Sequence, residues 1–194
     1  MDSKTLTAYA HRAEEYSAEW LAQPPPTDIY ELIKKFFKRG GKTIDVGCGS
    51  GRDTNWLNEN GYPTIGVDST KNLIEQATLL YPNLLFQVSN LPELTEVKQK
   101  FENVFCETVV MHLSADDIKQ SVLKLKSLLN KGGVIYLSWR VTESNDFRDL
   151  DGRLYTAFEP ALILDLFENE KILHFEEKIS LSSGKKVCRL IASL

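Results

Sequence analysis

Residues 44–53 read IDVGCGSGRD, with glycines at positions 47, 49 and 51 directly after a short apolar run. The run at 43–47 predicts a buried strand, and the residues after Gly51 predict a helix that continues to residue 61. Glycine tolerates a positive φ and lets the backbone come into contact with a ligand. The stretch therefore predicts a strand–loop–helix unit whose loop is a ligand-binding candidate.

The loop departs from two common phosphate-binding patterns. A P-loop ends in Gly-Lys-Ser/Thr, whereas Gly51, Arg52 and Asp53 occupy these positions here. The dinucleotide pattern GxGxxG, counted from Gly47, requires a third glycine where Arg52 stands. A tight glycine turn that binds nothing is the structural alternative.

Asp68 narrows the choice of ligand. It follows Gly49 by 19 residues and ends the second predicted strand, at 63–68. An acidic side chain at this place accepts both hydrogen bonds of a ribose diol. Asp68 and Ser69 also suit the N-cap of the next helix, and the two roles are compatible. The order strand, glycine loop, helix, strand and acid therefore predicts a nucleoside site.

From residue 42 onward, short apolar runs alternate with amphipathic runs. This alternation is typical of strands and helices joined by right-handed crossovers into a parallel sheet. The last two strands flank the turn SSGK and predict an antiparallel hairpin. We expect one α/β domain, 1–194, with helices on both faces of a Rossmann-like sheet of seven strands, at 43–47, 63–68, 84–89, 101–111, 133–139, 172–181 and 185–194.

The N-terminal segment predicts a separate helical arm. Residues 1–22 are amphipathic, and the prolines at 24–26 stop the helix, so 1–26 form an arm or lid on the main body. Thr27 or Asp28 can cap the next helix, which Gly40 and Gly41 are expected to end.

Two later helices carry their own boundary signals. Ser114 with Asp117 resembles a capping box, and Gly132 and Gly133 are expected to end the helix that it starts. Pro160 suits the first turn of a helix at 159–170.

The combination of these motifs resembles the class I S-adenosylmethionine-dependent methyltransferases of the small, soluble type. DVGCGSG at 45–51 matches the first motif of that family, GVD at 66–68 its ribose-binding acid, and NKGGVIYLSW at 130–139 its fifth strand. The C-terminal hairpin is a feature of this fold, and YAHRAEEYSAEW at 9–20 resembles the family's N-terminal lid. The resemblance covers residues 9–194 and implies S-adenosyl-L-methionine as the cofactor.

The resemblance also implies roles for individual residues. Asp45, Gly47 and Gly49, with Cys48 between them, would hold the methionine portion, and Asp68 with Ser69 the ribose. Ser89, Asn90 and Leu91 would face the adenine, where the family often has an aspartate. Cys106 and Glu107 would lie beside the sulfonium.

Methyl transfer requires that the nucleophile, the methyl carbon and the sulfur are aligned, and it requires a base only if the nucleophile arrives protonated. His112 follows the fourth strand at the expected edge of the sheet and is a candidate base; a locally hydrogen-bonded loop histidine is the alternative.

The long connection 140–155 is a candidate substrate rim through Arg140, Arg148, Arg153 and Tyr155, or a solvated loop with internal ion pairs. Tyr9 and Tyr16, with Trp20, either cover the cofactor as a lid or simply pack the arm on the core.

Composition restricts the partners. The formal net charge is −4, and the nucleic-acid-type Asn/Asp-Pro-Pro-Tyr/Phe motif is lacking, so we expect no nucleic acid as substrate. No apolar run is long enough for a membrane span, and the N-terminus is too polar for a secretory signal. The three cysteines lack metal-type spacing, so we expect reduced thiols, no metal site and a cytoplasmic protein. The leading hypothesis is methyl transfer to a small molecule, which would be anionic if the arginines face the site. Alternatives are methylation of a protein side chain, a non-catalytic cofactor-binding module and a nicotinamide oxidoreductase.

Overall fold

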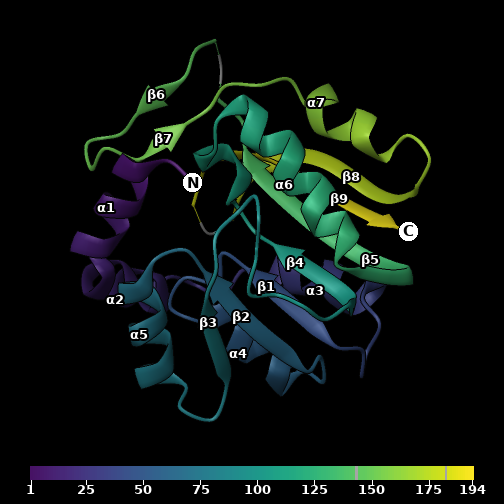
Figure 1. Ribbon diagram of the computed structural model, residues 1–194, viewed down its shortest axis with the longest axis horizontal. Coiled ribbons are helices and arrows are strands. Elements are labelled where there is room, and N and C mark those ends of the chain that lie inside the picture. Colours follow the sequence, from purple (N-terminus) through teal and green to yellow (C-terminus); the bar gives the residue numbers. More distant parts are fainter. Residues whose placement is uncertain (143, 182) are drawn as a thin grey trace.

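A computed structural model describes residues 1–142, 144–181 and 183–194. Its centre is a seven-stranded sheet in the order β3-β2-β1-β4-β5-β9-β8 (Figure 1). The strands are β1 Thr43–Val46, β2 Thr64–Asp68, β3 Leu85–Val88, β4 Phe101–Cys106, β5 Leu129–Arg140, β8 Lys171–Ile179 and β9 Lys186–Ser193. The expected α/β fold with a C-terminal antiparallel hairpin is confirmed.

The direction of the strands places the carboxyl ends of β1, β2, β4 and β5 at one edge. The pairs β1–β2, β2–β3, β1–β4 and β4–β5 are parallel, whereas β9 is antiparallel to both β5 and β8. Strand order reverses between β1 and β4, because β2 and β3 lie on one side of β1 and β4 lies on the other. Open α/β sheets bind ligands outside the carboxyl ends at such a switch point.

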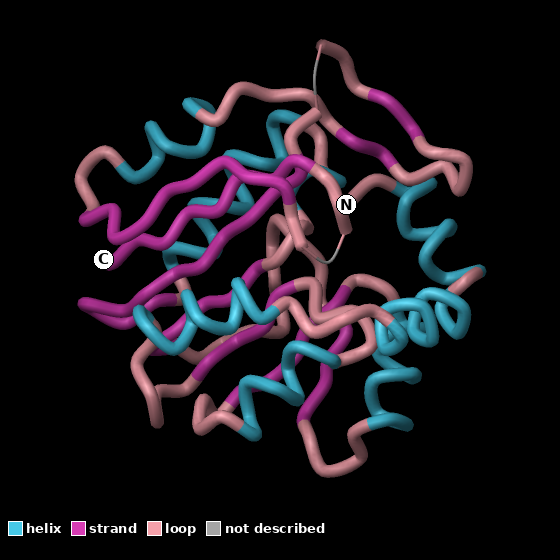
Figure 2. Tube along the Cα trace, turned by 180° about the vertical axis from the view of Figure 1, so that it is seen from behind, coloured by secondary structure: helices cyan, strands magenta, loops and turns pink. Residues whose placement is uncertain are grey.

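Helices cover both faces of the sheet (Figure 2). On one face α3 packs against Phe105 and Tyr136, and on the other α6 and α7 cover a larger apolar core around Val104, Ile135 and Leu137. The helices are α1 Ser3–His11, α2 Ala13–Ala22, α3 Thr27–Phe36, α4 Arg52–Glu59, α5 Lys71–Leu80, α6 Ala115–Ser127 and α7 Ala161–Leu164, with 3-10 turns η1 Val110–His112 and η2 Asp165–Phe167.

Several predicted boundaries are wrong because tertiary contacts end the elements early. The single helix over 1–22 is broken at Arg12, whose φ of −118° lies outside the helical range. Helix α3 starts at Thr27 with Pro26 at its N-cap, and it ends before the glycines at 40 and 41. Its end is fixed by the amide of Asn103, which accepts from Lys38 N and donates to Lys38 O.

The C-terminal half differs in the same way. Ser114 Oγ does accept a hydrogen bond from Asp117 N, but α6 ends at Ser127. Strand β5 then runs through both glycines, because Leu128 O already accepts from Phe101 N of β4. Pro160 occupies the N-cap of α7, which is only one turn long. The sequence also gave no signal for the short hairpin of β6 Phe147–Arg148 and β7 Leu154–Tyr155.

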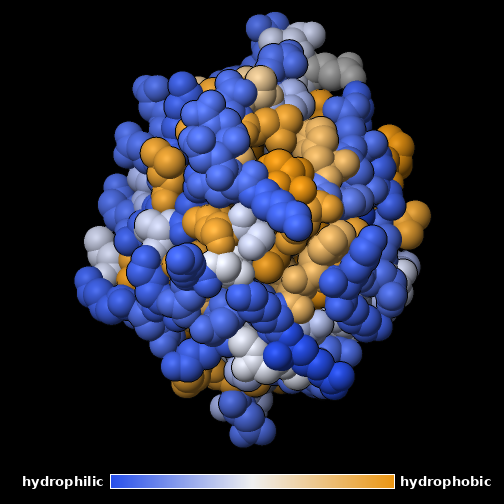
Figure 3. Space-filling view, turned by 90° about the vertical axis from the view of Figure 1, so that its right-hand side faces the viewer, coloured by the Kyte–Doolittle hydropathy of each residue, from blue (hydrophilic) through white to orange (hydrophobic). Residues whose placement is uncertain are grey.

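Figure 3 shows hydrophobic side chains gathered in the middle of the face that carries the C-terminal end of β9, with hydrophilic ones around them. Within the described ranges, no helix has the length and apolar character that a membrane crossing requires.

Candidate active site

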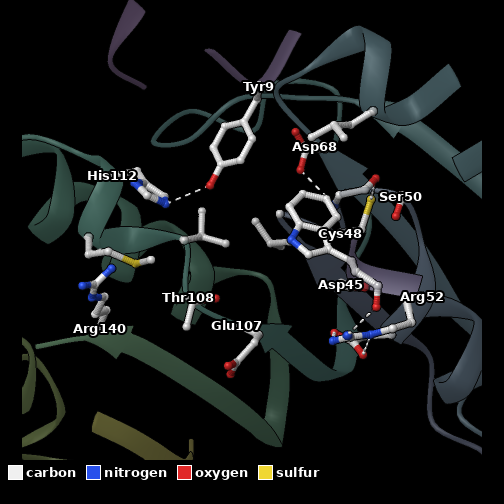
Figure 4. A pocket seen from close by; sticks show the side chains of 18 of the residues that line it. Tyr9, Asp45, Cys48, Ser50, Arg52, Asp68, Glu107, Thr108, His112 and Arg140 are labelled. Atoms are coloured by element: carbon white, nitrogen blue, oxygen red, sulfur yellow. Dashed lines mark hydrogen bonds and ion pairs between the residues drawn. The ribbon is translucent and has the colours of Figure 1, made fainter. Parts of the chain in front are cut away.

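A cavity of about 300 Å³ lies at the carboxyl ends of β1, β2, β4 and β5. The lid, defined here as α1 and α2, covers it, and the hairpin β6–β7 and the turn between β8 and β9 border one end. In Figure 4, Asp45, Cys48 and Asp68 lie on one side of this space, and His112 and Arg140 lie on the other. Most of the predicted cofactor residues and several of the predicted acceptor residues therefore share one cavity.

The glycine loop needs its glycines. Gly47 has a φ of 79°, and a Cβ there would lie 2.2 Å from Cγ2 of Val109. Gly49 has a φ of 54°, and a Cβ there would lie 2.8 Å from the ring of Trp20 in the lid. Contacts this short and these φ values exclude side chains at both positions. The loop is thus built to leave its backbone bare on the cavity side.

Asp68 holds the loop as well as facing the cavity. Its Oδ2 accepts from Gly49 N at 3.0 Å, and its Oδ1 accepts from Thr70 N at 2.8 Å. Thr70, and not Asp68 or Ser69, is the N-cap of α5, so the capping expectation is wrong. Burial raises the pKa of the Asp68 carboxyl, while the backbone hydrogen bonds oppose that rise.

Asp45 is a second buried carboxyl beside the loop. Thr54 of α4 donates its hydroxyl to Asp45 Oδ2 at 2.6 Å. Desolvation raises the pKa of Asp45 to about 8, and the neighbouring Asp53 and Asp68 add to the rise. A cationic group entering the cavity would relieve this penalty, which suits the ammonium of an amino acid.

Most of the predicted cofactor residues line the cavity, and two do not. Asn90 is exposed on the outside, and Cys106 is buried in the core on β4. Ser89 faces the cavity with a buried hydroxyl that has no hydrogen-bond partner among the described residues. Those that line the cavity are Asp45, Gly47, Cys48, Gly49, Asp68, Ser69, Ser89, Leu91 and Glu107.

Glu107 is held at the end of β4 by residues that the sequence did not single out. Tyr136 and Ser138 of β5 both donate their hydroxyls to Glu107 Oε2, the former at 2.6 Å. Ser138 Oγ in turn accepts from Thr108 N at 2.9 Å. Burial raises the pKa of Glu107, and the two hydroxyl donors oppose that rise. Strand pairing brings these groups together across about 30 residues of sequence, a separation that no local pattern encodes.

His112 lies at the end of η1 and lines the cavity. Its Nδ1 is 2.6 Å from Leu154 O, and its Nε2 is 3.1 Å from the hydroxyl of Tyr9. Burial is the main cause that lowers the pKa of His112 to about 4; the charges of Arg153 and Arg140 act in the same direction, whereas the hydrogen bond to Leu154 O and the charge of Asp149 oppose the fall. The imidazole is therefore neutral at physiological pH.

The arginines of 140–155 divide between the two predicted roles. Arg140 lines the cavity, with its guanidinium 4.8 Å from the ring centroid of Tyr155. Arg153 also lines it, but is paired with Asp149 at 2.7 Å. Arg148 points away and pairs with Asp2 at 2.8 Å. Arg140 has no carboxylate partner among the described residues, so its charge is available to a ligand.

The lid is fastened to the β6–β7 hairpin. Tyr16 and Arg12 donate to the Asp151 carboxylate at 2.6 and 2.7 Å, and Leu154 N donates to Thr5 Oγ1 at 2.9 Å. Tyr16 therefore fastens the lid and does not line the cavity, whereas Tyr9 and Trp20 line the cavity. The two predicted roles for this segment, lid and core packing, coexist.

The residues present fit S-adenosylmethionine. Ser50, like Ser89, has a buried hydroxyl that faces the cavity without a partner among the described residues, and Asp45 and Asp68 offer carboxylates to an ammonium and a ribose. Lining residues that the sequence did not indicate include Arg52, Thr108, Ser183 and Lys185. Among the described residues, no group of three or more His, Cys, Asp or Glu side chains could hold a metal ion.

Comparison with known proteins agrees with this geometry. Residues 44–133 match a family model described as a methyltransferase domain. An uncharacterized methyltransferase of Alkaliphilus oremlandii is 24% identical over 139 residues, which are 72% of this chain and 62% of that protein. A ubiquinone biosynthesis O-methyltransferase of Coxiella burnetii is 27% identical over 117 residues, 58% of this chain and 49% of that protein. The chain thus spans between about half and 62% of these two relatives.

A solved structure supports the fold over the whole chain. The 1,6-didemethyltoxoflavin-N1-methyltransferase of Burkholderia thailandensis, crystallised with 1,6-didemethyltoxoflavin and S-adenosylhomocysteine, superposes with a TM-score of 0.78 at 15% identity. The alignment covers 98% of this chain and 87% of that one. Together, the methyltransferase domain matched at residues 44–133 and this structural likeness show that the chain has the Rossmann-like fold of methyltransferases.

Proposed function

We propose that this protein transfers the methyl group of S-adenosylmethionine to a small acceptor that carries a negative charge. The cofactor supplies an electrophilic methyl group on a sulfonium. The sulfur leaves as a neutral thioether and needs no assistance. The protein then has to align acceptor, methyl carbon and sulfur, and to exclude water.

The charge distribution within the cavity carries the proposal. Asp45 and Asp68 gather at the glycine loop, where an ammonium and a ribose would bind. Arg140 and Lys185 line the opposite part, and neither has a carboxylate partner among the described residues. One cavity thus has a half suited to the cofactor and a half suited to an anion such as a carboxylate or phosphate.

The size and cover of the cavity favour a small molecule over a macromolecule. Lid and hairpin are bonded to each other above it, and a protein side chain or a nucleic acid would need that cover open. The names of two similar proteins point the same way, since one is an N1-methyltransferase of 1,6-didemethyltoxoflavin and the other an O-methyltransferase of ubiquinone biosynthesis. A cytoplasmic location is part of the proposal, and the three free, buried cysteines support it.

Transfer of a labelled methyl group tests this function. The protein is incubated with methyl-labelled S-adenosylmethionine and, separately, with small molecules, protein and RNA from a bacterial extract. We expect label in the small-molecule fraction, on species that an anion exchanger retains. Label in protein or RNA would contradict the proposal. Tight binding of S-adenosylhomocysteine with no transfer to any fraction would instead favour a non-catalytic regulatory module.

A further inference from the structure

We propose that Tyr9 and His112 form a proton relay, and that the acceptor therefore enters as a neutral O–H or N–H group. This inference rests on the proposed methyl transfer and adds the kind of atom that receives the methyl group. A protonless acceptor, such as a halide or a thioether, would need no such relay.

The direction of the relay follows from His112 Nδ1. Its partner at 2.6 Å is the carbonyl oxygen of Leu154, which only accepts hydrogen bonds, so Nδ1 carries the proton. In the neutral ring, Nε2 then has a free lone pair. The Tyr9 hydroxyl, 3.1 Å away, donates its proton to that lone pair (Figure 4). The lone pairs of the Tyr9 oxygen can then accept from other donors, of which Arg153 is one and the O–H or N–H of an acceptor would be the second.

Both relay groups face the space where an acceptor would bind. Tyr9, His112 and Arg140 line the same end of the cavity. An anionic acceptor held by Arg140 could thus present its O–H or N–H to the Tyr9 oxygen. The relay and the anion site use different groups of one acceptor molecule.

The surroundings keep both groups neutral between turnovers. Burial raises the pKa of the Tyr9 phenol well above its usual range, although Arg153 opposes that rise. His112 is faced by Tyr9 on α1, by Arg140 on β5 and by the hairpin residues Asp149, Arg153 and Tyr155. The balance of burial and these charges holds the pKa of His112 near 4, so Nε2 is free to accept a proton at physiological pH.

The transfer step balances as follows. The acceptor atom forms a bond to the methyl carbon as the bond from that carbon to the cofactor sulfur breaks. The acceptor proton passes to the Tyr9 oxygen, while the proton of Tyr9 passes to His112 Nε2. The products are the methylated acceptor, S-adenosylhomocysteine and an imidazolium that remains bonded to Leu154 O. Its low pKa then drives release of that proton to water.

The lid and the edge of the sheet each supply one member of the relay. Tyr9 comes from α1, whereas His112 belongs to the sheet edge. The backbone of Leu154 links the two elements, because its carbonyl accepts from His112 Nδ1 and its N–H donates to Thr5 on α1, the helix that carries Tyr9. The backbone of Leu154 therefore positions His112 and also holds the helix that carries Tyr9.

Two probe acceptors of the same shape test the relay. At pH 8, 4-hydroxybenzoate presents a neutral phenol O–H, whereas 4-mercaptobenzoate arrives as a thiolate, and both carry a carboxylate for Arg140. We expect Tyr9→Phe to lower the single-turnover rate on the phenol about a hundredfold and on the thiolate by less than about threefold. Tyr16→Phe is the matched control, because it removes a lid hydroxyl that fastens but does not face the cavity, and it should affect both probes equally.

A second measurement needs no turnover. In the complex with S-adenosylhomocysteine, ¹⁵N NMR of histidine, assigned with His112→Asn, should show His112 protonated at Nδ1 only and neutral down to about pH 4. Equal losses on both probes with Tyr9→Phe, or a His112 protonated at Nε2, would overturn the relay. If the wild-type protein methylates neither probe, the NMR measurement decides: protonation of His112 at Nδ1 supports the relay, and protonation at Nε2 overturns it. Failure of the proposed function is a different result: no methyl group would then be transferred to any small molecule in the label-transfer experiment.

Discussion

Asp68 is the residue whose role the spacing of the sequence predicted most directly. If it binds the ribose, Asp68→Ala should weaken binding of S-adenosylhomocysteine by about 1–3 kcal/mol through loss of charge-assisted hydrogen bonds. Calorimetry measures this loss. Because Asp68 also accepts from Gly49 N, thermal unfolding of the variant should be compared with that of Asp68→Asn, which keeps an acceptor oxygen. Unchanged affinity in a folded Asp68→Ala protein would refute this placement of the ribose.

Asp45 predicts a pH dependence of cofactor binding. Its pKa of about 8 means that the carboxyl is mostly protonated at pH 7 before binding. An ammonium nearby favours the carboxylate, so binding should release a proton, and affinity should rise with pH up to about 8. Calorimetry in buffers of different ionisation enthalpy counts the protons released. Asp45→Asn should abolish most of the release, and heat that is independent of buffer in the wild type would contradict the assignment.

Arg140 and Arg148 form a natural matched pair for the anion site. Arg140 lines the cavity without a carboxylate partner among the described residues, whereas Arg148 is paired with Asp2 outside it. With the acceptor recovered by label transfer, Arg140→Met should raise KM about 10- to 100-fold, the loss expected for a hydrogen bond to a charged group. Affinity for S-adenosylhomocysteine should stay the same. A similar rise in KM with Arg148→Met would show that the effect is not specific to the cavity.

At the scale of elements, the lid and the β6–β7 hairpin act as one cover. Asp151 accepts from both Arg12 and Tyr16 and is one of three points where the hairpin is joined to the N-terminal segment, with Leu154 at Thr5 and Arg148 at Asp2. Asp151→Asn should speed dissociation of S-adenosylhomocysteine about tenfold, as seen by stopped-flow fluorescence of Trp20, whose ring lies over Gly49. Glu31→Gln, which removes an exposed ion pair on α3, serves as control. Equal dissociation rates in the two variants would mean that the fastening does not limit release.

The elements also show what the sequence could predict. The glycine loop and the strand that precedes it were correct, because their signal lies in adjacent residues and in backbone conformations that only glycine adopts readily. Helix ends were less accurate where a distant partner competes for the backbone, as Asn103 does at Lys38. The β6–β7 hairpin escaped notice because two strands of two residues each leave no periodicity to read.

At the scale of the molecule, the order of the strands completes the site. It places Tyr136 and Ser138 beside Glu107, and it brings the β8–β9 turn with Lys185 to the rim of the cavity. These contributions depend on which strands are neighbours, so a reading of local motifs could not supply them. The proposed cofactor half of the site, built from one loop and the end of the next strand, was accessible to such a reading. The proposed acceptor half is assembled from distant segments of the chain, and a reading of local motifs identified only some of its residues.

A crystal structure with S-adenosylhomocysteine bound tests the central claim most directly. We predict both ribose hydroxyls within hydrogen-bond distance of the Asp68 carboxylate, the ammonium beside Asp45, and the sulfur facing the part of the cavity lined by Tyr9, His112 and Arg140. A ribose away from Asp68, or a sulfur that points away from these three side chains, would contradict the proposed methyl transfer at this site.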